Sequence, residues 1–223
     1  MNYVVKIYLR KWGLLGLWIL WGLSTFSTHG MNFAFAPLGK SSQVEVGLST
    51  AFAGGEIRGA FPRVGGQIEF KPEYIASTKG KVNLDARALQ FGNYKVSGDA
   101  HSTEWLGSDQ FPEISYTLSG LKQARWRGKE LLATAHGSLK MKNRVSPFSM
   151  PVSIRYYRDQ RRKVDGVKGD LIVLSGESSI SRSQLGINPG TMMDAVMDKI
   201  RIKINLVGGS NRVRPFLPSA LFQ

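Results

Sequence analysis

The sequence has no cysteine and only three histidines. The lack of cysteine excludes a disulfide framework, a thiolate metal site and a cysteine nucleophile. His29 falls in an N-terminal leader, so a histidine metal site would need both His101 and His136 together with carboxylates, because such sites normally bring three or more ligands together. The two histidines are more simply explained as structural or surface residues. We therefore expect no metal site and no cofactor.

Catalytic motifs are missing as well. The sequence contains no Gly-x-Ser-x-Gly motif, no Gly-rich phosphate loop of the common types and no dinucleotide fingerprint. Ser102 directly follows His101, whereas the members of a catalytic triad usually meet from separate elements. The 16 acidic residues leave a glycosidase-like carboxylate pair open, although no pair stands out. We predict a binding protein and not an enzyme.

Acidic residues are scarce relative to basic ones, with 16 against 30 and a formal net charge of +14. This excess indicates a solvated basic surface, or attraction to anionic lipid headgroups or to nucleic acid. Basic side chains surround aromatic ones in two clusters, each interpretable as a solvated hairpin tip or as a contact with a membrane interface. The clusters are Lys122, Arg125, Trp126, Arg127 and Lys129, and Tyr156, Tyr157, Arg158, Arg161, Arg162 and Lys163.

Long apolar runs are also rare, and the clearest one spans residues 12–23. It follows the basic residues Lys6, Arg10 and Lys11, and it is shorter than the roughly 20 residues that a membrane-spanning helix needs. The pattern predicts a signal peptide over residues 1–30, with cleavage open as far as residue 36. A retained anchor is the minor alternative. Export to the periplasm or beyond makes nucleic acid an unsuitable partner.

Glycine-rich turns separate short segments in which apolar and polar residues alternate, as in strands with one buried face. These segments predict an all-β chain with a single antiparallel β-barrel of about eight strands over residues 42–208, followed by a C-terminal tail at 209–223. The predicted strands cover residues 42–52, 57–63, 67–71, 81–86, 113–122, 131–141, 149–157, 170–181 and 200–206.

One or two short helices are expected beside the barrel. Asp99 is a candidate N-cap for a helix that carries Trp105 and Leu106 and ends at Gly107. A second helical turn is expected at residues 192–197.

Several motifs, taken in order along the chain, resemble the YceI family. They are Gly59-x-Phe61 with Gly66-x-Ile68-x-Phe70, Asp99-x-His101, Phe111-Pro112-Glu113-Ile114-x-Tyr116, Gly137-x-Leu139 and Ser181-Arg182-Ser183-x-x-Gly186-Ile187. The chain departs from the family pattern in three places. Ser41-Ser42 replaces an opening Asp-x-x-His-Ser. Lys140-Met141-Lys142-Asn143 stands where the family has Thr-x-His-Gly, and Leu185 replaces a phenylalanine.

The resemblance implies a lipocalin-like periplasmic barrel that holds an isoprenoid quinone, a polyprenyl lipid or another long-chain amphiphile for transport, storage or stress protection. It also implies a homodimer as one oligomeric state. The alternative is a filled barrel that binds an anionic partner or membrane surface through its basic clusters. The candidate cavity residues are Phe61, Ile68, Phe70, Leu84, Trp105, Leu106, Phe111, Ile114, Tyr116, Met150, Val152, Ile154, Ile202 and Ile204; from the residues alone they equally fit a solid core.

Overall fold

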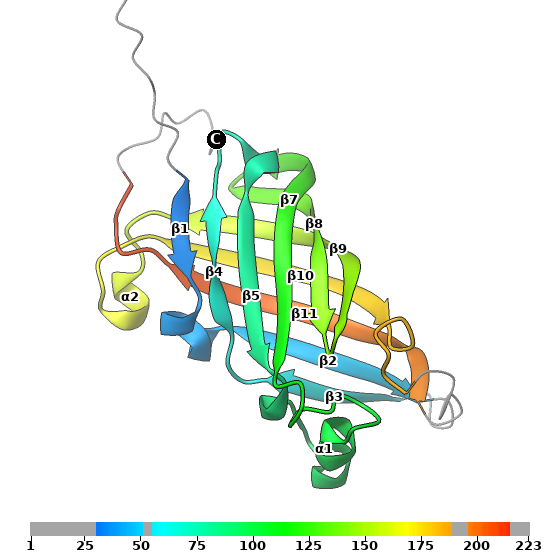
Figure 1. Cartoon of the computed structure of the whole chain (residues 1–223). Coiled ribbons are helices and arrows are strands. Elements are labelled where there is room, and N and C mark those ends of the chain that lie inside the picture. Colours follow the sequence, from blue (N-terminus) through cyan, green and yellow to red (C-terminus); the bar gives the residue numbers. More distant parts are fainter. Residues whose placement is uncertain (1–29, 51–54, 189–195, 215–223) are drawn as a thin grey trace, which may run out of the picture.

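The computed structural model describes residues 30–50, 55–188 and 196–214, and within them the chain forms an antiparallel β-barrel (Figure 1). Residues 1–29 of the predicted leader, residues 192–195 of the expected helical turn and the last residues of the tail lie outside these ranges. The other two residues of that expected turn, Val196 and Met197, belong to a strand, so no helix forms there. The strands are β1 (Met31–Ala34), β2 (Gln43–Thr50), β3 (Glu56–Phe61), β4 (Gly65–Phe70), β5 (Lys79–Asp85), β6 (Gln90–Phe91), β7 (Glu113–Arg127), β8 (Glu130–Met141), β9 (Arg144–Tyr157), β10 (Leu171–Ser181) and β11 (Val196–Gly209).

The barrel closes through the short strand β1, which pairs with β4 on one side and with β11 on the other, where Ala34 faces Gly209. The closed ring runs β1-β4-β5-β7-β8-β9-β10-β11 and returns to β1. Strands β2, β3 and β6 extend from β11 as a side branch of the same sheet. The predicted single antiparallel barrel of about eight strands is therefore confirmed, with three additional strands among the described residues.

The ring-closing strand precedes the predicted start of the barrel at residue 42. Phe33 and Phe35 are almost fully buried, and the 3₁₀ helix η1 (Ala36–Ser41) follows them. A strand of four residues is too short to show a clear two-residue alternation in the sequence. For that reason the sequence does not predict β1, which lies between the expected leader and the predicted start of the barrel.

The helix in the central loop begins earlier than predicted. Helix α1 spans Tyr94–His101, and the side chain of Asn93 accepts hydrogen bonds from the N–H groups of Lys95 and Val96. Asn93 is thus the N-cap, and the prediction of Asp99 for this role is wrong. Trp105 and Leu106 lie in the turn that follows the helix, and Gly107 adopts a positive φ of 57° there. The remaining short helices are η2 (Ile75–Ser77), η3 (Ala86–Ala88) and α2 (Arg162–Asp165).

Helices α1 and α2 mark two different ends of the barrel, which we call the α1 end and the α2 end (Figure 1). The α1 end also contains the β8–β9 turn, the end of β10 and the start of β11. The α2 end contains β1, the β7–β8 turn and the start of β10. Its interior is filled, because Phe33 meets Tyr156 edge to face with ring centroids 6.3 Å apart. Around this pair lie the fully buried side chains of Phe35, Phe70, Leu131, Ile154 and Ile172.

No helix in the described part of the chain is both long enough and apolar enough to cross a bilayer.

Candidate functional site: an apolar cavity at the α1 end

The half of the barrel nearest α1 is hollow. The volume of this cavity that the centre of a water-sized sphere can occupy is about 150 Å³. All of its atom-free space, including the part open to solvent, amounts to about 1100 Å³. Its wall comes from every described strand except β1 and β4, and from α1 and the loops beside it. The exposed surface of that wall is entirely apolar. A cavity with such a wall stays dry and suits an apolar guest.

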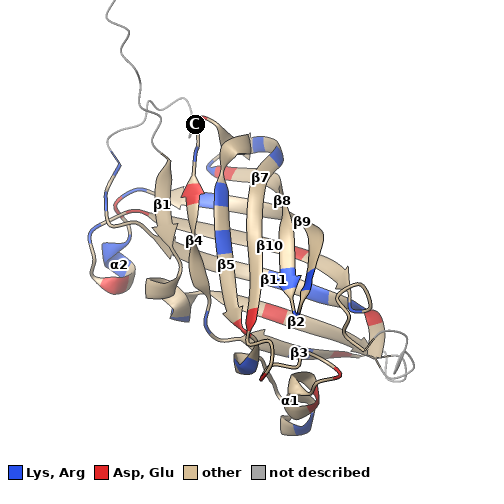
Figure 2. Ribbon diagram, in the orientation of Figure 1, with Lys and Arg blue, Asp and Glu red and all other residues tan. Residues whose placement is uncertain are grey.

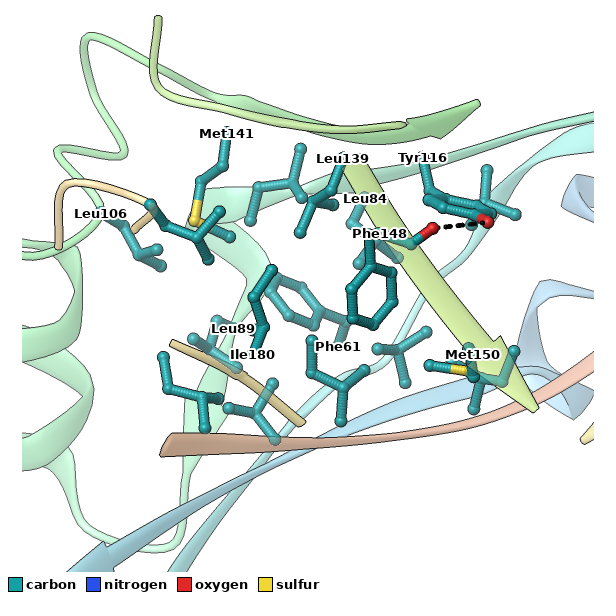
Figure 3. A pocket seen from close by; sticks show the side chains of 18 of the residues that line it. Phe61, Leu84, Leu89, Leu106, Tyr116, Leu139, Met141, Phe148, Met150 and Ile180 are labelled. Carbon is teal, nitrogen blue, oxygen red and sulfur yellow. Dashed lines mark hydrogen bonds between the residues drawn. The ribbon is translucent and has the colours of Figure 1, made fainter. Parts of the chain in front are cut away.

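The aromatic rings of Phe61 from β3 and Phe148 from β9 both line the cavity, and they occupy the centre of the view in Figure 3. The ring of Phe148 also meets that of Tyr116 edge to face, with centroids 6.0 Å apart. The Tyr116 hydroxyl donates a hydrogen bond to the backbone carbonyl of Phe148 at 3.4 Å (Figure 3). Burial raises the pKa of Tyr116 to about 12, so the phenol keeps its proton at neutral pH and the wall stays uncharged.

Most of the candidate residues predicted from the sequence lie on the cavity wall, but four do not. The lining residues among them are Phe61, Leu84, Trp105, Leu106, Ile114, Tyr116, Met150, Val152, Ile202 and Ile204. Ile68 and Phe70 lie on β4, opposite Phe33 and Met31 of β1, and they pack in the filled α2 end. Ile154 is buried at that end as well. Phe111 is half-buried and lies against Gly107, beside the cavity.

These four differ because alternation along a strand predicts which face a side chain occupies and not how far along the barrel it lies. The cavity has further lining residues that were not among the candidates. Some of these, such as Val46 and Leu48 on β2, carry the same alternating signal. Others come from the loops and the two-residue strand β6, such as Leu89, Phe91, Leu185 and Ile187, where no periodic signal exists.

A buried arginine borders the cavity without lining it. Arg182 is fully buried, and its guanidinium lies 5.6 Å from the ring centroid of Trp105, a cation–π contact. The same guanidinium donates hydrogen bonds to the carbonyl oxygens of Ile187 and Val196, at 3.3 and 3.2 Å. Arg182 thus joins Trp105 to the segment after β10 and to the start of β11.

The two basic clusters lie at the α2 end, away from the cavity (Figure 2). The first occupies the β7–β8 hairpin, where its lysine and arginine side chains are exposed. The second is only partly a surface cluster, because Arg161 is buried and paired with Asp165. The Tyr156 hydroxyl donates to Asp170, and burial together with this bond raises the pKa of Tyr156. The interpretation of all six residues as a hairpin tip is therefore wrong for Arg161 and Tyr156.

The histidines form no metal site in the described parts of the chain, where no three metal-ligating side chains of the His, Asp or Glu type gather. His136 lies beside the Ser149 hydroxyl, with Nδ1 and Oγ 2.9 Å apart. His101 lies at the end of α1, on a different element. The cavity can hold an apolar molecule.

Comparisons with known structures agree with this fold. BcnA from Burkholderia cenocepacia is 18% identical, with a TM-score of 0.61 over 74% of this chain and 95% of its own. The YCEI protein of Campylobacter jejuni is 14% identical, with a TM-score of 0.59 over 71% and 87% of the two chains. A polyisoprenoid binding domain from Saccharophagus degradans, implicated in plant cell wall breakdown, is 10% identical, with a TM-score of 0.60 over 82% and 99%. No curated protein matches the chain.

The closed antiparallel barrel and its apolar cavity define a lipocalin-like β-barrel. The YceI-like domain profile matches residues 37–208. The chain therefore belongs to the YceI family, and the resemblance found in the sequence is confirmed.

Proposed function

We propose that this protein is an exported carrier that holds an isoprenoid or another long-chain amphiphile by its hydrocarbon tail, inside the cavity at the α1 end. The observation that carries the proposal is the entirely apolar wall of that cavity. Membership of the YceI family and the likeness to a polyisoprenoid binding domain support a lipid-binding barrel. The ligand would be transported, stored or kept as protection against stress, and it would undergo no reaction.

The energetics of such a site need no polar contact. Each buried CH₂ group contributes about 0.8 kcal/mol, so a tail gains affinity in proportion to the length that enters. A polar headgroup would find no exposed polar surface inside the cavity, and burying it there would cost free energy. We therefore expect the tail to enter and the headgroup to stay at the α1 end.

Mass spectrometry of the purified exported protein tests the proposal, first in the native state and then after solvent extraction. We expect a stoichiometric polyprenyl, quinone or other long-chain mass that is released by the solvent. The same spectrum reports the mature N-terminus, whether a homodimer forms and whether the leader has been removed. A clean ligand-free mass, with no uptake of offered polyprenols, would contradict the carrier function.

A pair of neighbouring variants localises the ligand. Ile204 lines the cavity, whereas the next residue on β11, Asn205, is exposed on the outer face. We expect Ile204→Arg to lose the co-purified ligand and Asn205→Arg to keep it. Equal ligand loads in two folded variants would place the ligand elsewhere.

A second candidate function is contact with an anionic membrane surface through the β7–β8 hairpin. Lys122, Arg125, Arg127 and Lys129 are exposed there, and cations near a surface contribute about 1 kcal/mol each to binding anionic lipid. Replacement of all four by glutamine should abolish sedimentation with phosphatidylglycerol vesicles. Binding that survives this change would exclude the hairpin, and binding by a protein with no internal lipid would favour this function over the carrier.

A further inference from the structure

The cavity is covered at the α1 end by the turn Ser102 to Gly107, which we call the cover turn. Trp105 and Leu106 from this turn lie on the cavity wall. The turn is closed by its own backbone, because the N–H groups of Trp105 and Gly107 both donate to the carbonyl oxygen of Ser102, at 3.1 and 2.7 Å. It is therefore a compact unit whose position over the cavity depends on its connections to the barrel.

Leu106 anchors the turn by packing in the core, and its N–H donates to the carbonyl oxygen of Ala100 at the end of α1, at 3.1 Å. The remaining connections are polar. From the β8–β9 turn, the Lys142 ammonium donates to the carbonyl oxygens of Thr103 and Trp105, at 3.2 and 3.0 Å. On the side of the segment after β10, the Asn188 N–H donates to the carbonyl of Glu104 at 3.1 Å, and Arg182 lies over the Trp105 ring. In addition to the packing of Leu106, one lysine on one side and two contacts on the other thus join the cover turn to the β8–β9 turn and to the segment after β10.

The hydrogen bonds of Lys142 to the cover turn can open and close at low cost. It is half-buried, so its ammonium regains water when the bonds to the carbonyls open. Its backbone adopts a positive φ of 52° in the tight turn to Asn143, and the side chain reaches the cover turn from there. Arg182 is fully buried, so the contact on the other side cannot open in this way.

We propose that Lys142 is a latch, a positioning residue that holds the cover turn over the cavity and thereby sets the rate at which a ligand enters and leaves. The inference rests on the proposed carrier function.

The first test is hydrogen exchange, which needs no ligand. In Lys142→Met the aliphatic stem remains but the two donated bonds are lost. We expect the amides of Trp105, Leu106 and Gly107 to exchange roughly tenfold faster than in the wild type. Lys140→Met is the matched control, since Lys140 is an exposed lysine two residues away. Equal exchange in the two variants would overturn the latch.

The second test measures ligand exchange. Protein loaded with radiolabelled geranylgeraniol is mixed with excess phosphatidylcholine vesicles, and transfer to the vesicles is followed over time. We expect transfer roughly tenfold faster from Lys142→Met than from the wild type or Lys140→Met. Equal transfer rates would show that the cover turn does not limit exchange, and would overturn the gating role.

The third test is a chemical cross-link between the cover turn and the β8–β9 turn. Introduced cysteines can be cross-linked selectively, because the chain has no cysteine of its own. The double variant Thr103→Cys/Lys142→Cys, joined by a short bis-maleimide, should release geranylgeraniol far more slowly than either single variant treated with the same reagent. Unchanged release from the cross-linked protein would mean that the ligand leaves by another route, and would overturn the proposal.

If no variant binds geranylgeraniol, the carrier function fails, while the hydrogen-exchange result still decides whether Lys142 fastens the turn.

Discussion

Arg161 and Asp165 form an ion pair at the α2 end, with Nη2 and Oδ2 2.8 Å apart, although both residues come from a stretch that looks like a solvated basic loop in the sequence. The Arg161 side chain is 5% exposed, and it also donates to the carbonyl oxygen of Ser210 at 3.1 Å. The guanidinium therefore joins the α2 segment to the residue that follows β11. Arg162 and Lys163, its neighbours in the chain, are exposed.

This difference in burial predicts a large effect on stability from one substitution and almost none from its neighbour. Arg161→Met leaves the Ser210 carbonyl without its arginine donor, and we expect a loss of about 2–3 kcal/mol in the free energy of unfolding. Arg162→Met should change it by less than about 0.5 kcal/mol. Urea unfolding of the two variants measures both effects. Similar midpoints would contradict a structural role for Arg161.

Much of the barrel is predictable from the sequence, because the alternation in segments such as 200–206 and 44–48 reflects a sheet with one buried face. The side chains of Ile200, Ile202, Ile204 and Leu206 all line the cavity. The alternation contains no information on the level of a residue along the barrel axis. That is why Ile154 and Ile202 looked equivalent, although only Ile202 lines the cavity.

Other features depend on contacts between distant parts of the chain. Closure of the barrel by β1 requires the pairing of Ala34 with Gly209, which no local pattern encodes. The burial of Arg161 depends on Ser210, and the placement of Trp105 depends on Lys142 and Arg182. The start of the helix is ambiguous in the sequence, because Asn93 and Asp99 are both acceptable N-caps; in the structure Asn93 caps α1 and Asp99 lies inside the helix.

Filling the cavity distinguishes a hollow barrel from a solid one. Ala135 and Ala133 lie on the same face of β8, and only Ala135 lines the cavity. Ala135→Phe should occupy empty space and leave the stability of the ligand-free protein unchanged or raise it by about 0.5–2 kcal/mol, while ligand uptake falls. Ala133→Phe should overpack the filled region and cost about 1–3 kcal/mol. Equal destabilisation in urea unfolding would indicate that no usable cavity exists.

Tyr116 predicts how the cavity responds to alkali. Its pKa is raised to about 12 from a usual value of 10.0 by burial, so the folded state disfavours the phenolate. The stability that the buried neutral phenol provides is fully present below pH 10, where the unfolded chain is also neutral at this position. It is lost as the pH rises toward 12, because the unfolded chain ionises first. Over that range, the wild type should lose more stability than Tyr116→Phe, which has no titrating group at this position. Unfolding measurements at a series of pH values test the difference, and parallel curves would refute it.

The position of β1 predicts where the expected leader could be cut without loss of the barrel. A cut after Ala36 would remove Phe33 and Phe35, which are 0% and 1% exposed, together with the strand that closes the ring. Burying two phenylalanines contributes roughly 3–6 kcal/mol, so a chain beginning at Pro37 should be destabilised by at least that amount relative to one beginning at Gly30. Urea unfolding of the two chains measures this loss. If the predicted leader is removed, we accordingly expect the remaining chain to start at or before Met31, which its intact mass would report. A natural start at Pro37 with undiminished stability would show that the barrel does not need β1.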